Sequence, residues 1–525
     1  MSAVVDLEDE LVGTTPDTSI AVSNPQKRTT KRWSFHNNKK PDLVNLVAEV
    51  AGEGKRRLTD VGDGDRVHNE IDPLCILGGA QLYLTELGRL FHAGKICIVL
   101  AGLPGRGKTH LLVALTRYLR WLGVTTHSFH LGNYRRAKAD DLDYDLFVPH
   151  PDNHDASDIR QKIVDECLND VLNFFKHDRG QIAIYDAVNA LPEYRIDLAR
   201  RFQEVNVQVL FIELLVDDDS LIMKNIALAA KLSPDYRLWD YQKAYEDYSN
   251  RIQHLTPYYR EMGKTEGEQQ LSYIKINNFG ERIEVHNSNY GYLVNKVLFF
   301  IMNSTIKLGL VYFARCWKRE LHNTEDPPLD DEGKVHAHNV TQTLLEHLRS
   351  KGREYAKDDC GKDKAAPLSA DGARDGLVVW GSVKQRTLEY LKEFTDRGFT
   401  IRQRIQLSKK IPGVVAGMSD EEIKDSYPED YASYQSDPYH FRYPRLELYH
   451  DLAIKIEPLI LEMERMNGDL LVVADDTVIK VFLGYLLSVL CYDIPNLEIA
   501  QDEIVEIQFN AYANTFERIK VKEFK

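Results

Sequence analysis

The stretch of sequence that decides the fold reads Lys95-Ile-Cys-Ile-Val-Leu-Ala101-Gly102-Leu-Pro-Gly-Arg-Gly-Lys108-Thr109. After Lys95 it opens with a continuous apolar run, which is typical of a strand buried on both faces of a parallel sheet. From residue 109 to 122, leucines and a tyrosine recur at helical spacing and predict a helix with one apolar face. A buried strand, a glycine-rich turn and a helix in this order predict an α/β domain.

The glycine-rich turn has the spacing of a phosphate-binding loop. Gly102, Gly105 and Gly107 let the backbone curl so that successive N–H groups point at phosphate oxygens. Lys108 is placed to reach the terminal phosphates, and the Thr109 hydroxyl to ligate Mg²⁺, at the positive end of the helix dipole. The spacing alone arises by chance in many proteins, but here a strand precedes it and a helix follows. We therefore expect this loop to bind a nucleotide with Mg²⁺.

Further apolar runs on either side of predicted helices extend the α/β pattern along the chain. Strands are predicted at residues 126–131, 181–186 and 207–213, with a helix at 158–175. A second set follows, with strands at 308–314, 376–380 and 469–474 and a helix at 449–466. The segment 350–376 is rich in Lys, Asp, Gly and Ala and reads as a surface insertion. We therefore predict two α/β domains, at residues 93–305 and 306–525.

Composition and the first 70 residues limit the classes of protein that fit. The net charge of −14 argues against nucleic-acid and anionic-membrane binding, and no apolar stretch is long enough to span a bilayer. The six cysteines are scattered and no secretory signal is visible, so a cytoplasmic location is the simplest expectation. Residues 1–70 are polar, which predicts a disordered extension. Within it, Lys31-Arg32-Trp33-Ser34 either suits a protein kinase acting on Ser34 or is a chance match in a solvated tail.

Two features beyond the loop are candidates for the same site. Asp186 ends a predicted strand, and ligands in open α/β sheets bind beyond the carboxyl ends of strands. Asp186 could therefore face Mg²⁺, or it could simply cap the next helix. Arg135 and Arg136 follow another strand, and paired guanidinium groups match the oxygens of a phosphorylated acceptor. An arginine pair alone is more often a solvated surface.

Together the motifs resemble the 6-phosphofructo-2-kinase/fructose-2,6-bisphosphatase family, in its fungal type with a degenerate phosphatase domain. The resemblance covers about residues 93–520. The matching segments are Gly102-Leu-Pro-Gly-Arg-Gly-Lys-Thr109, Thr116-Arg-Tyr-Leu-Arg-Trp-Leu-Gly123, Gly132-Asn-Tyr-Arg-Arg136, Gly180-Gln-Ile-Ala-Ile-Tyr-Asp-Ala-Val-Asn189, Lys231-Leu-Ser-Pro-Asp-Tyr236, Ser272-Tyr-Ile-Lys-Ile276, Tyr427-Pro-Glu-Asp430 and Phe441-Arg-Tyr-Pro-Arg445.

The resemblance implies a P-loop kinase domain with a parallel sheet, followed by a phosphoglycerate mutase-like (histidine phosphatase) domain. It implies phosphorylation of fructose 6-phosphate at its 2-hydroxyl with Mg-ATP, in a homodimer. Lys108 and Asp186 then take catalytic roles, and Thr109 and Asp186 hold Mg²⁺. The remaining implied contacts are Asn225 and Lys231 on the nucleotide side, and Arg135, Arg136, Arg195 and Arg251 on the sugar phosphate.

The sugar side departs from the family pattern. The family's Phe-Arg-Pro-Asp-Asn reads Pro149-His-Pro-Asp-Asn153 here, so its arginine is lost. The family's Asp-Ala-Thr-Asn-Thr-Thr reads Asp186-Ala-Val-Asn-Ala-Leu191, so its threonines are lost, and a tyrosine four residues after Arg251 is Leu255. The nucleotide side is better preserved than the acceptor side.

The second domain departs further, because three groups of the phosphatase chemistry are missing. Arg315-Cys316-Trp317 stands where Arg-His-Gly is expected, and Asp475 stands where a second histidine is expected. The acidic residue expected before Gly413 is replaced in Ser408-Lys409-Lys410. Arg315 and Arg386 either keep a weak anion site or only support the fold. We expect no bisphosphatase activity.

The sequence leaves three functions open. The first is a 6-phosphofructo-2-kinase with a degenerate phosphatase site at Arg315, Cys316, Arg386 and Asp475. The second is a regulatory pseudoenzyme that binds nucleotide without turnover. The third is a kinase that acts on another sugar phosphate.

Overall fold

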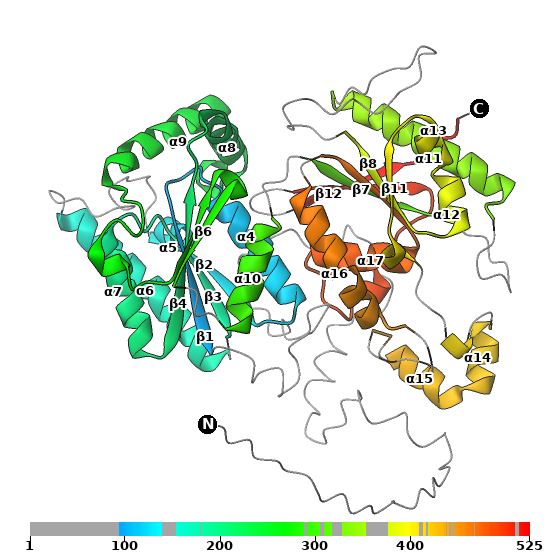
Figure 1. Ribbon diagram of the computed structural model, residues 1–525, viewed down its shortest axis with the longest axis horizontal. Helices are drawn as coiled ribbons and strands as arrows, with labels where there is room; N and C mark the ends of the chain where they lie inside the picture. Colours follow the sequence, from blue (N-terminus) through cyan, green and yellow to red (C-terminus); the bar gives the residue numbers. More distant parts are fainter. Residues whose placement is uncertain are drawn as a thin grey trace, which may run out of the picture. The chain divides into compact units, whose positions relative to one another are not determined.

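The computed structural model describes residues 94–138, 154–178, 180–287, 291–304, 309–317, 328–352, 376–408, 413–415, 418–436, 438–439, 441, 443, 445, 447–466, 468–509 and 514–524 (Figure 1). The predicted extension at residues 1–70, Ser34, the stretch 149–153 and most of the insertion at 350–376 lie outside these residues. Within the described part of the chain, no helix has the length and apolar character needed to cross a membrane.

The first sheet contains the phosphate-loop strand near its centre. Its six strands lie in the order β2-β3-β1-β4-β5-β6, and all neighbours are parallel except β5 and β6. The strands are β1 Lys95–Ala101, β2 Thr126–His130, β3 Ile182–Asp186, β4 Val207–Leu215, β5 Tyr273–Asn277 and β6 Arg282–His286. The predicted strands are confirmed within two residues at each end.

Helices cover both faces of this sheet (Figure 1). In β1, Ile96, Ile98 and Leu100 belong to a hydrophobic cluster that includes α4 and α10, whereas the alternate residues pack with α6 and α7. The continuous apolar run of β1 therefore reflects burial on both faces. The helices are α4 Lys108–Trp121, α5 Leu131–Lys138, α6 His154–His177, α7 Pro192–Glu204, α8 Asp219–Leu232, α9 Tyr241–Leu255 and α10 Tyr292–Met302. Short 3₁₀ turns are η5 Pro234–Tyr236, η6 Thr256–Tyr258, η7 Glu266–Glu268 and η8 Asn278–Gly280.

The second sheet has the order β12-β11-β7-β10-β8-β9, with β7, β10, β8 and β9 parallel and β11 antiparallel to its neighbours. Its strands are β7 Leu310–Arg315, β8 Val378–Gly381, β9 Thr400–Gln403, β10 Leu470–Ala474, β11 Glu503–Gln508 and β12 Thr515–Lys520. Its helices are α11 Asp331–Ser350, α12 Gln385–Tyr390, α13 Lys392–Asp396, α14 Asp420–Ser426, α15 Pro428–Ser436, α16 Tyr449–Arg465 and α17 Asp476–Leu486. Short turns are η9 Ile405–Leu407, η10 Gly413–Val415 and η11 Ile494–Asn496. Two α/β domains with parallel-rich sheets are thus confirmed.

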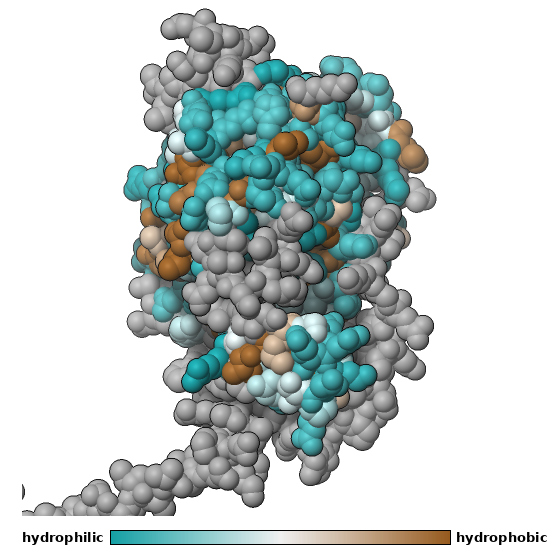
Figure 2. All heavy atoms as spheres, turned by 90° about the vertical axis from the view of Figure 1, so that its right-hand side faces the viewer, coloured by the Kyte–Doolittle hydropathy of each residue, from teal (hydrophilic) through white to brown (hydrophobic). Residues whose placement is uncertain are grey.

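One hydrophobic cluster includes residues of both domains. It contains Tyr118 and Trp121 of α4 together with Ile456 of α16 and Phe482 of α17. The described residues of both sheets accordingly fall into one compact unit within residues 54–525. Figure 2 shows a face on which hydrophilic residues predominate and hydrophobic ones form small scattered groups, as is usual for a surface in water.

Candidate active site

The loop after β1 has the backbone shape that its glycines predict. Gly102 has a φ of +136°, and a Cβ at this position would lie 2.6 Å from the carbonyl oxygen of Leu214 in β4. No residue with a side chain fits there without moving the neighbouring strand. Gly107, the residue before α4, has a φ of +84°, a left-handed conformation that glycine adopts at little cost. The sequence Gly102 to Gly107 therefore specifies both the close approach to the sheet and the entry into α4.

Lys108 lies inside the loop that it follows. Its Nζ donates hydrogen bonds to the carbonyl oxygens of Gly102 and Leu103, at 2.7 and 2.8 Å, and the residue is buried. Burial lowers the pKa of Lys108 to about 8, the charge of Asp186 acts to raise it, and that of Arg251 to lower it further. The N–H groups that Lys108 uses for these two carbonyl oxygens could instead donate to phosphate oxygens.

Two helices hold the tip of the loop. The side-chain amide of Asn225, on α8, donates to the carbonyl oxygen of Gly105 at 2.8 Å. The backbone N–H of Gly105 donates to the hydroxyl of Tyr248, on α9, at 3.0 Å. Asn225 therefore lies on the nucleotide loop, where the resemblance placed it, whereas no sequence pattern singled out Tyr248.

Asp186 ends β3, next to β1 in the sheet. It pairs with Leu100 of β1 in register and with His130 of β2, and its Oδ2 lies 3.1 Å from Nδ1 of His130. The carboxylate therefore lies at the same sheet edge as the phosphate loop, and its charge acts on Lys108. A hydroxyl at Thr109 and a carboxylate at Asp186 are oxygen donors of the kind that Mg²⁺ prefers, so the residues present fit the expected ion.

Three arginines converge on one carboxylate beside this edge. Asp235, in η5, accepts from Arg135 and Arg136 of α5 at 2.7 Å each and from Arg251 of α9 at 3.0 Å. Burial would raise the pKa of Asp235, but the charges of the three arginines outweigh it and lower this pKa to about 2. Three guanidinium groups on one carboxylate make a cluster of donors of the kind that binds phosphate oxygens.

The corresponding edge of the second sheet is organised differently. Nη2 of Arg386 lies 3.0 Å from Oδ1 of Asp475, and both side chains are largely buried. Sγ of Cys316 lies 3.8 Å from the hydroxyl oxygen of Thr387, and burial raises the pKa of the thiol to about 11. Nη1 of Arg315 donates to the carbonyl oxygen of Ile499 at 2.6 Å. The structure thus brings Cys316, Arg386 and Asp475 together, and Asp475 neutralises the arginine.

Comparisons with known proteins match the two domains to two families. A family model described as 6-phosphofructo-2-kinase matches residues 84–307, and one described as histidine phosphatase superfamily (branch 1) matches residues 358–522. A Saccharomyces cerevisiae protein, described as a candidate 6-phosphofructo-2-kinase/fructose-2,6-bisphosphatase, is 39% identical over 95% of this chain and 94% of its own length. This chain belongs to the 6-phosphofructo-2-kinase/fructose-2,6-bisphosphatase family.

Other similar proteins are more distant. Human 6-phosphofructo-2-kinase/fructose-2,6-bisphosphatase 1 is 31% identical over 82% of this chain and 85% of its own length. Among solved structures, the α-ribazole phosphatase of Shigella flexneri matches 41% of this chain and 96% of its own at 15% identity, with a TM-score of 0.31.

One residue of the expected sugar-phosphate site lies in a buried network. Arg195, on α7, is completely buried. Its Nε lies 2.6 Å from Oε1 of Glu268, and its Nη1 donates to the carbonyl oxygens of Asn189 and Arg260, at 2.9 Å each. The network fixes the guanidinium next to the backbone that follows β3, and its contact with a sugar phosphate remains a prediction.

Lys231 lies apart from Asn225, although both are on α8. It is exposed in the last turn of the helix, with Nζ 5.5 Å from the centroid of the Tyr241 ring. Its contact with nucleotide remains a prediction.

The sequence pattern did not identify Asp235 as part of the site, although Asp235 lies inside the motif Lys231 to Tyr236. A single acidic residue at such a position is typical of a helix cap.

A cavity of about 360 Å³ lies beside the phosphatase-like edge. Its charged lining is balanced, because Arg518 is paired with Glu503 at 2.6 Å and Lys480 with Asp476 at 3.6 Å. The remaining lining residues are Arg315, Leu497, Glu498, Ile499 and Ala500. The cavity therefore lacks a cluster of several arginines on one carboxylate such as the one in the first domain.

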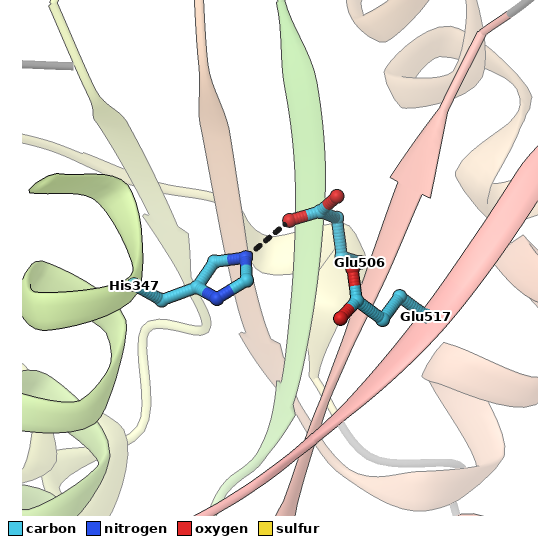
Figure 3. A group of neighbouring side chains, drawn as sticks. All are labelled: His347, Glu506 and Glu517. Atoms are coloured by element: carbon cyan, nitrogen blue, oxygen red, sulfur yellow. Dashed lines mark hydrogen bonds and ion pairs between the residues drawn. The ribbon is translucent and has the colours of Figure 1, made fainter. Parts of the chain in front are cut away.

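A second group of polar side chains lies on the far side of the second domain. Nε2 of His347, on α11, lies 2.7 Å from Glu506 of β11, and Glu517 of β12 lies next to them (Figure 3). Three such ligands could hold a metal ion, but the ammonium of Lys351 already contacts both carboxylates. We interpret the group as an ion-pair network that fixes α11 to the β11–β12 hairpin.

Proposed function

We propose that the first domain transfers the terminal phosphoryl group of ATP to the 2-hydroxyl of fructose 6-phosphate and so forms fructose 2,6-bisphosphate. The observation that carries this proposal is the presence of two groups of phosphate-binding side chains beside one sheet edge. One is the loop that encloses Lys108, and the other is the arginine cluster on Asp235. The charge of Arg251, which belongs to the arginine cluster, and that of Asp186 both act on the pKa of Lys108. The two sites are therefore close enough for their charges to interact.

The residues of the first site support binding of the ATP phosphates. The backbone of the loop from Gly102 to Gly107 and the start of α4 offer N–H groups and the positive helix end. Lys108 can exchange the carbonyl oxygens of Gly102 and Leu103 for phosphate oxygens, since its burial makes any new anionic partner favourable. Mg²⁺, held by Thr109 and Asp186, supplies neutralisation of charge on the transferred group.

The residues of the second site support binding of the acceptor phosphate. Arg135 and Arg136 come from α5 and Arg251 comes from α9, so two elements enclose the anion. Asp235 keeps the three guanidinium groups together, because each of them contacts its carboxylate. In-line phosphoryl transfer depends mainly on alignment and charge stabilisation, and these residues provide both.

The pseudoenzyme reading has one specific observation in its favour. Leu103, Val188, Ala190 and Leu255 form an apolar cluster beside the phosphate loop. Threonine and tyrosine occupy positions 188 and 255 in the pattern that this chain resembles, so hydroxyl donors toward the sugar are missing. Loss of these donors weakens the acceptor side more than the nucleotide side, and it also favours a change of acceptor.

The deciding assay incubates the full chain with Mg-ATP and fructose 6-phosphate and measures fructose 2,6-bisphosphate. Glucose 6-phosphate serves as a second acceptor, and Lys108→Ala as the inactive comparison. Product from fructose 6-phosphate with the unaltered chain alone supports the proposal. ATP binding by calorimetry without product contradicts it and favours the pseudoenzyme, whereas product only from glucose 6-phosphate favours a changed acceptor.

We further propose that the second domain has no bisphosphatase activity. A Cys316 thiol with a pKa near 11 is almost entirely protonated at neutral pH and is a poor nucleophile. Asp475 places a carboxylate on Arg386, where a phosphate anion would have to bind. Phosphate release from fructose 2,6-bisphosphate by the Lys108→Ala chain, whose kinase is disabled, would refute this part. A homodimer in the cytoplasm completes the proposal, and light scattering of the purified chain tests the dimer.

A further inference from the structure

A buried ion pair connects the phosphate-loop helix α4 to the second domain. Nη2 of Arg117, on α4, lies 2.8 Å from Oε1 of Glu464 on α16, and the two side chains are 4% and 2% exposed. The hydroxyl of Tyr485, on α17, donates to the same oxygen at 2.7 Å. The guanidinium carbon of Arg117 also lies 5.1 Å from the centroid of the Tyr485 ring. The carboxylate of Glu464 is therefore shared between an element of each domain.

A second set of contacts repeats this connection two helical turns away. Glu457 lies seven residues before Glu464, which puts both on the same face of α16. Its Oε1 accepts from the hydroxyl of Tyr118 at 2.9 Å and lies 3.5 Å from Nζ of Lys296 on α10. Trp121 meets the ring of Tyr485 edge-on, with centroids 5.7 Å apart. The C-terminal half of α4 is thus held by two helices of the second domain.

The other end of α4 is the phosphate site. The helix begins at Lys108, nine residues before Arg117, so about 13 Å of continuous helix separates the two ends. A helix is stiff over this length, so a shift of Arg117 along the axis is passed on to Lys108 and Thr109. The position of the loop residues therefore depends on where α16 holds the helix.

The Arg117–Glu464 contact is better suited to positioning α4 against α16 than to stabilising the packing of the two helices. Apolar side chains of similar volume stabilise a protein as well as a buried ion pair does, whereas a buried pair can fix the register of the elements that it joins. The surrounding apolar residues of α4, α16 and α17 already supply cohesion. The ion pair between Arg117 and Glu464 adds a preferred position of α4 along its own axis relative to α16.

We propose that Glu464 is a positioning residue for the phosphate loop: through Arg117, the second domain fixes the setting of α4 and hence of Lys108 and Thr109. The inference rests on the proposed nucleotide role of that loop. A domain whose own catalytic groups are replaced then contributes to the chemistry of its neighbour.

The test compares three variants of the full chain by hydrogen exchange without nucleotide. Glu464→Ala removes the pair, and Glu464→Gln keeps its shape without the charge. Glu462→Ala is the matched control, because Glu462 lies on the same helix but contacts Arg402 and Arg404 of its own domain. We expect exchange of the amides from residue 102 to 112 to rise at least tenfold in Glu464→Ala, less in Glu464→Gln, and not in the control.

Kinetics give a second readout that separates positioning from general damage. We expect the KM for ATP to rise about tenfold in Glu464→Ala, with the KM for fructose 6-phosphate within twofold. If Glu464→Ala does not fold, the double variant Arg117→Met with Glu464→Leu removes both charges. It is expected to recover the thermal midpoint while the loop amides still exchange faster.

The outcomes distinguish this inference from the proposed function. Loop exchange equal to that of the Glu462→Ala control overturns the inference, as does a double variant that recovers both stability and loop protection. Altered exchange in a chain without kinase activity supports the inference and refutes the kinase. Unchanged exchange in an active kinase refutes the inference and supports the kinase.

Discussion

The two domains present the same kind of edge, at the carboxyl ends of parallel strands, with opposite electrostatics. In the first domain, three arginines contact one carboxylate, Asp235. In the second, Arg386 contacts Asp475 one to one. A sheet edge attracts anions where its cations outnumber the carboxylates that they contact. Fold places the side chains, but the balance of charges decides whether a phosphate is attracted.

Removing the loop lysine is the strongest way to break this contrast. Lys108→Met takes away the cation that donates to the loop carbonyl oxygens, so we expect kcat for fructose 2,6-bisphosphate formation to fall roughly 10²–10³-fold. Steady-state assays with saturating ATP measure it. Lys176→Met, at an exposed position on α6, is the matched control. A comparable loss in the control would show that the effect is not specific to the loop.

The backbone of the loop gives the next largest effect. Gly102→Ala places a methyl group 2.6 Å from the Leu214 carbonyl oxygen, so we expect the free energy of unfolding to fall by about 2–3 kcal/mol. Gly280→Ala is the control for backbone strain alone, because Gly280 also has a positive φ but has open space around it. Urea titrations of both variants measure the difference. Equal losses would mean that the contact with β4 contributes nothing.

The arginine cluster makes a pH-dependent contribution to stability. The folded-state pKa of Asp235 is about 2, below its ordinary value of 3.8. Its contribution, about 2 kcal/mol, is therefore present above pH 4 and is lost as the pH falls toward 2. We expect Asp235→Asn to abolish this part of the acid dependence, measured as the difference in unfolding free energy between the two chains from pH 5 to pH 2.5. Parallel curves would contradict the pairing.

The smallest expected effect concerns the Arg386–Asp475 pair of the second domain. In Asp475→Asn, Arg386 loses its carboxylate and a charge that raises the pKa of Cys316 disappears. We expect alkylation of Cys316 by iodoacetamide at pH 8 to become about tenfold faster, and phosphate to slow it. Asp476→Asn, at the next position and paired with Lys480, is the control. Equal rates in the two variants would sink the proposed role of Asp475.

What could be predicted from the sequence was local. The run from Lys95 to Thr109 encodes its own strand, turn and helix start, because apolar burial and glycine conformations are set by neighbours in the chain. Partners distant in sequence were not visible. Tyr248 reaches Gly105 across 143 residues, and Asp235 reaches Arg135 across 100. Nothing in a linear pattern reports such meetings.

Arg195 shows a different limit. The resemblance places this arginine on the sugar phosphate, and the structure places its side chain in a buried network with Glu268. Residue type and order are the same for a structural arginine and a ligand-binding one, and burial alone does not separate them, because Arg135 is buried as well. At Cys316 and Asp475 the departure from the family pattern is visible in the residue type itself, and the loss of bisphosphatase activity stays a prediction.

The hydrophobic cluster shared by α4, α16 and α17 has a consequence for how such a chain can change over generations. A mutation at Asp475 changes a polar edge of the second domain and leaves its hydrophobic clusters untouched. A stop codon near residue 305 would instead remove α16 and α17, which pack against Tyr118 and Trp121. The exposed apolar side chains would make the shortened product prone to degradation. Selection can thus let the chemistry of a domain decay while it still preserves the domain.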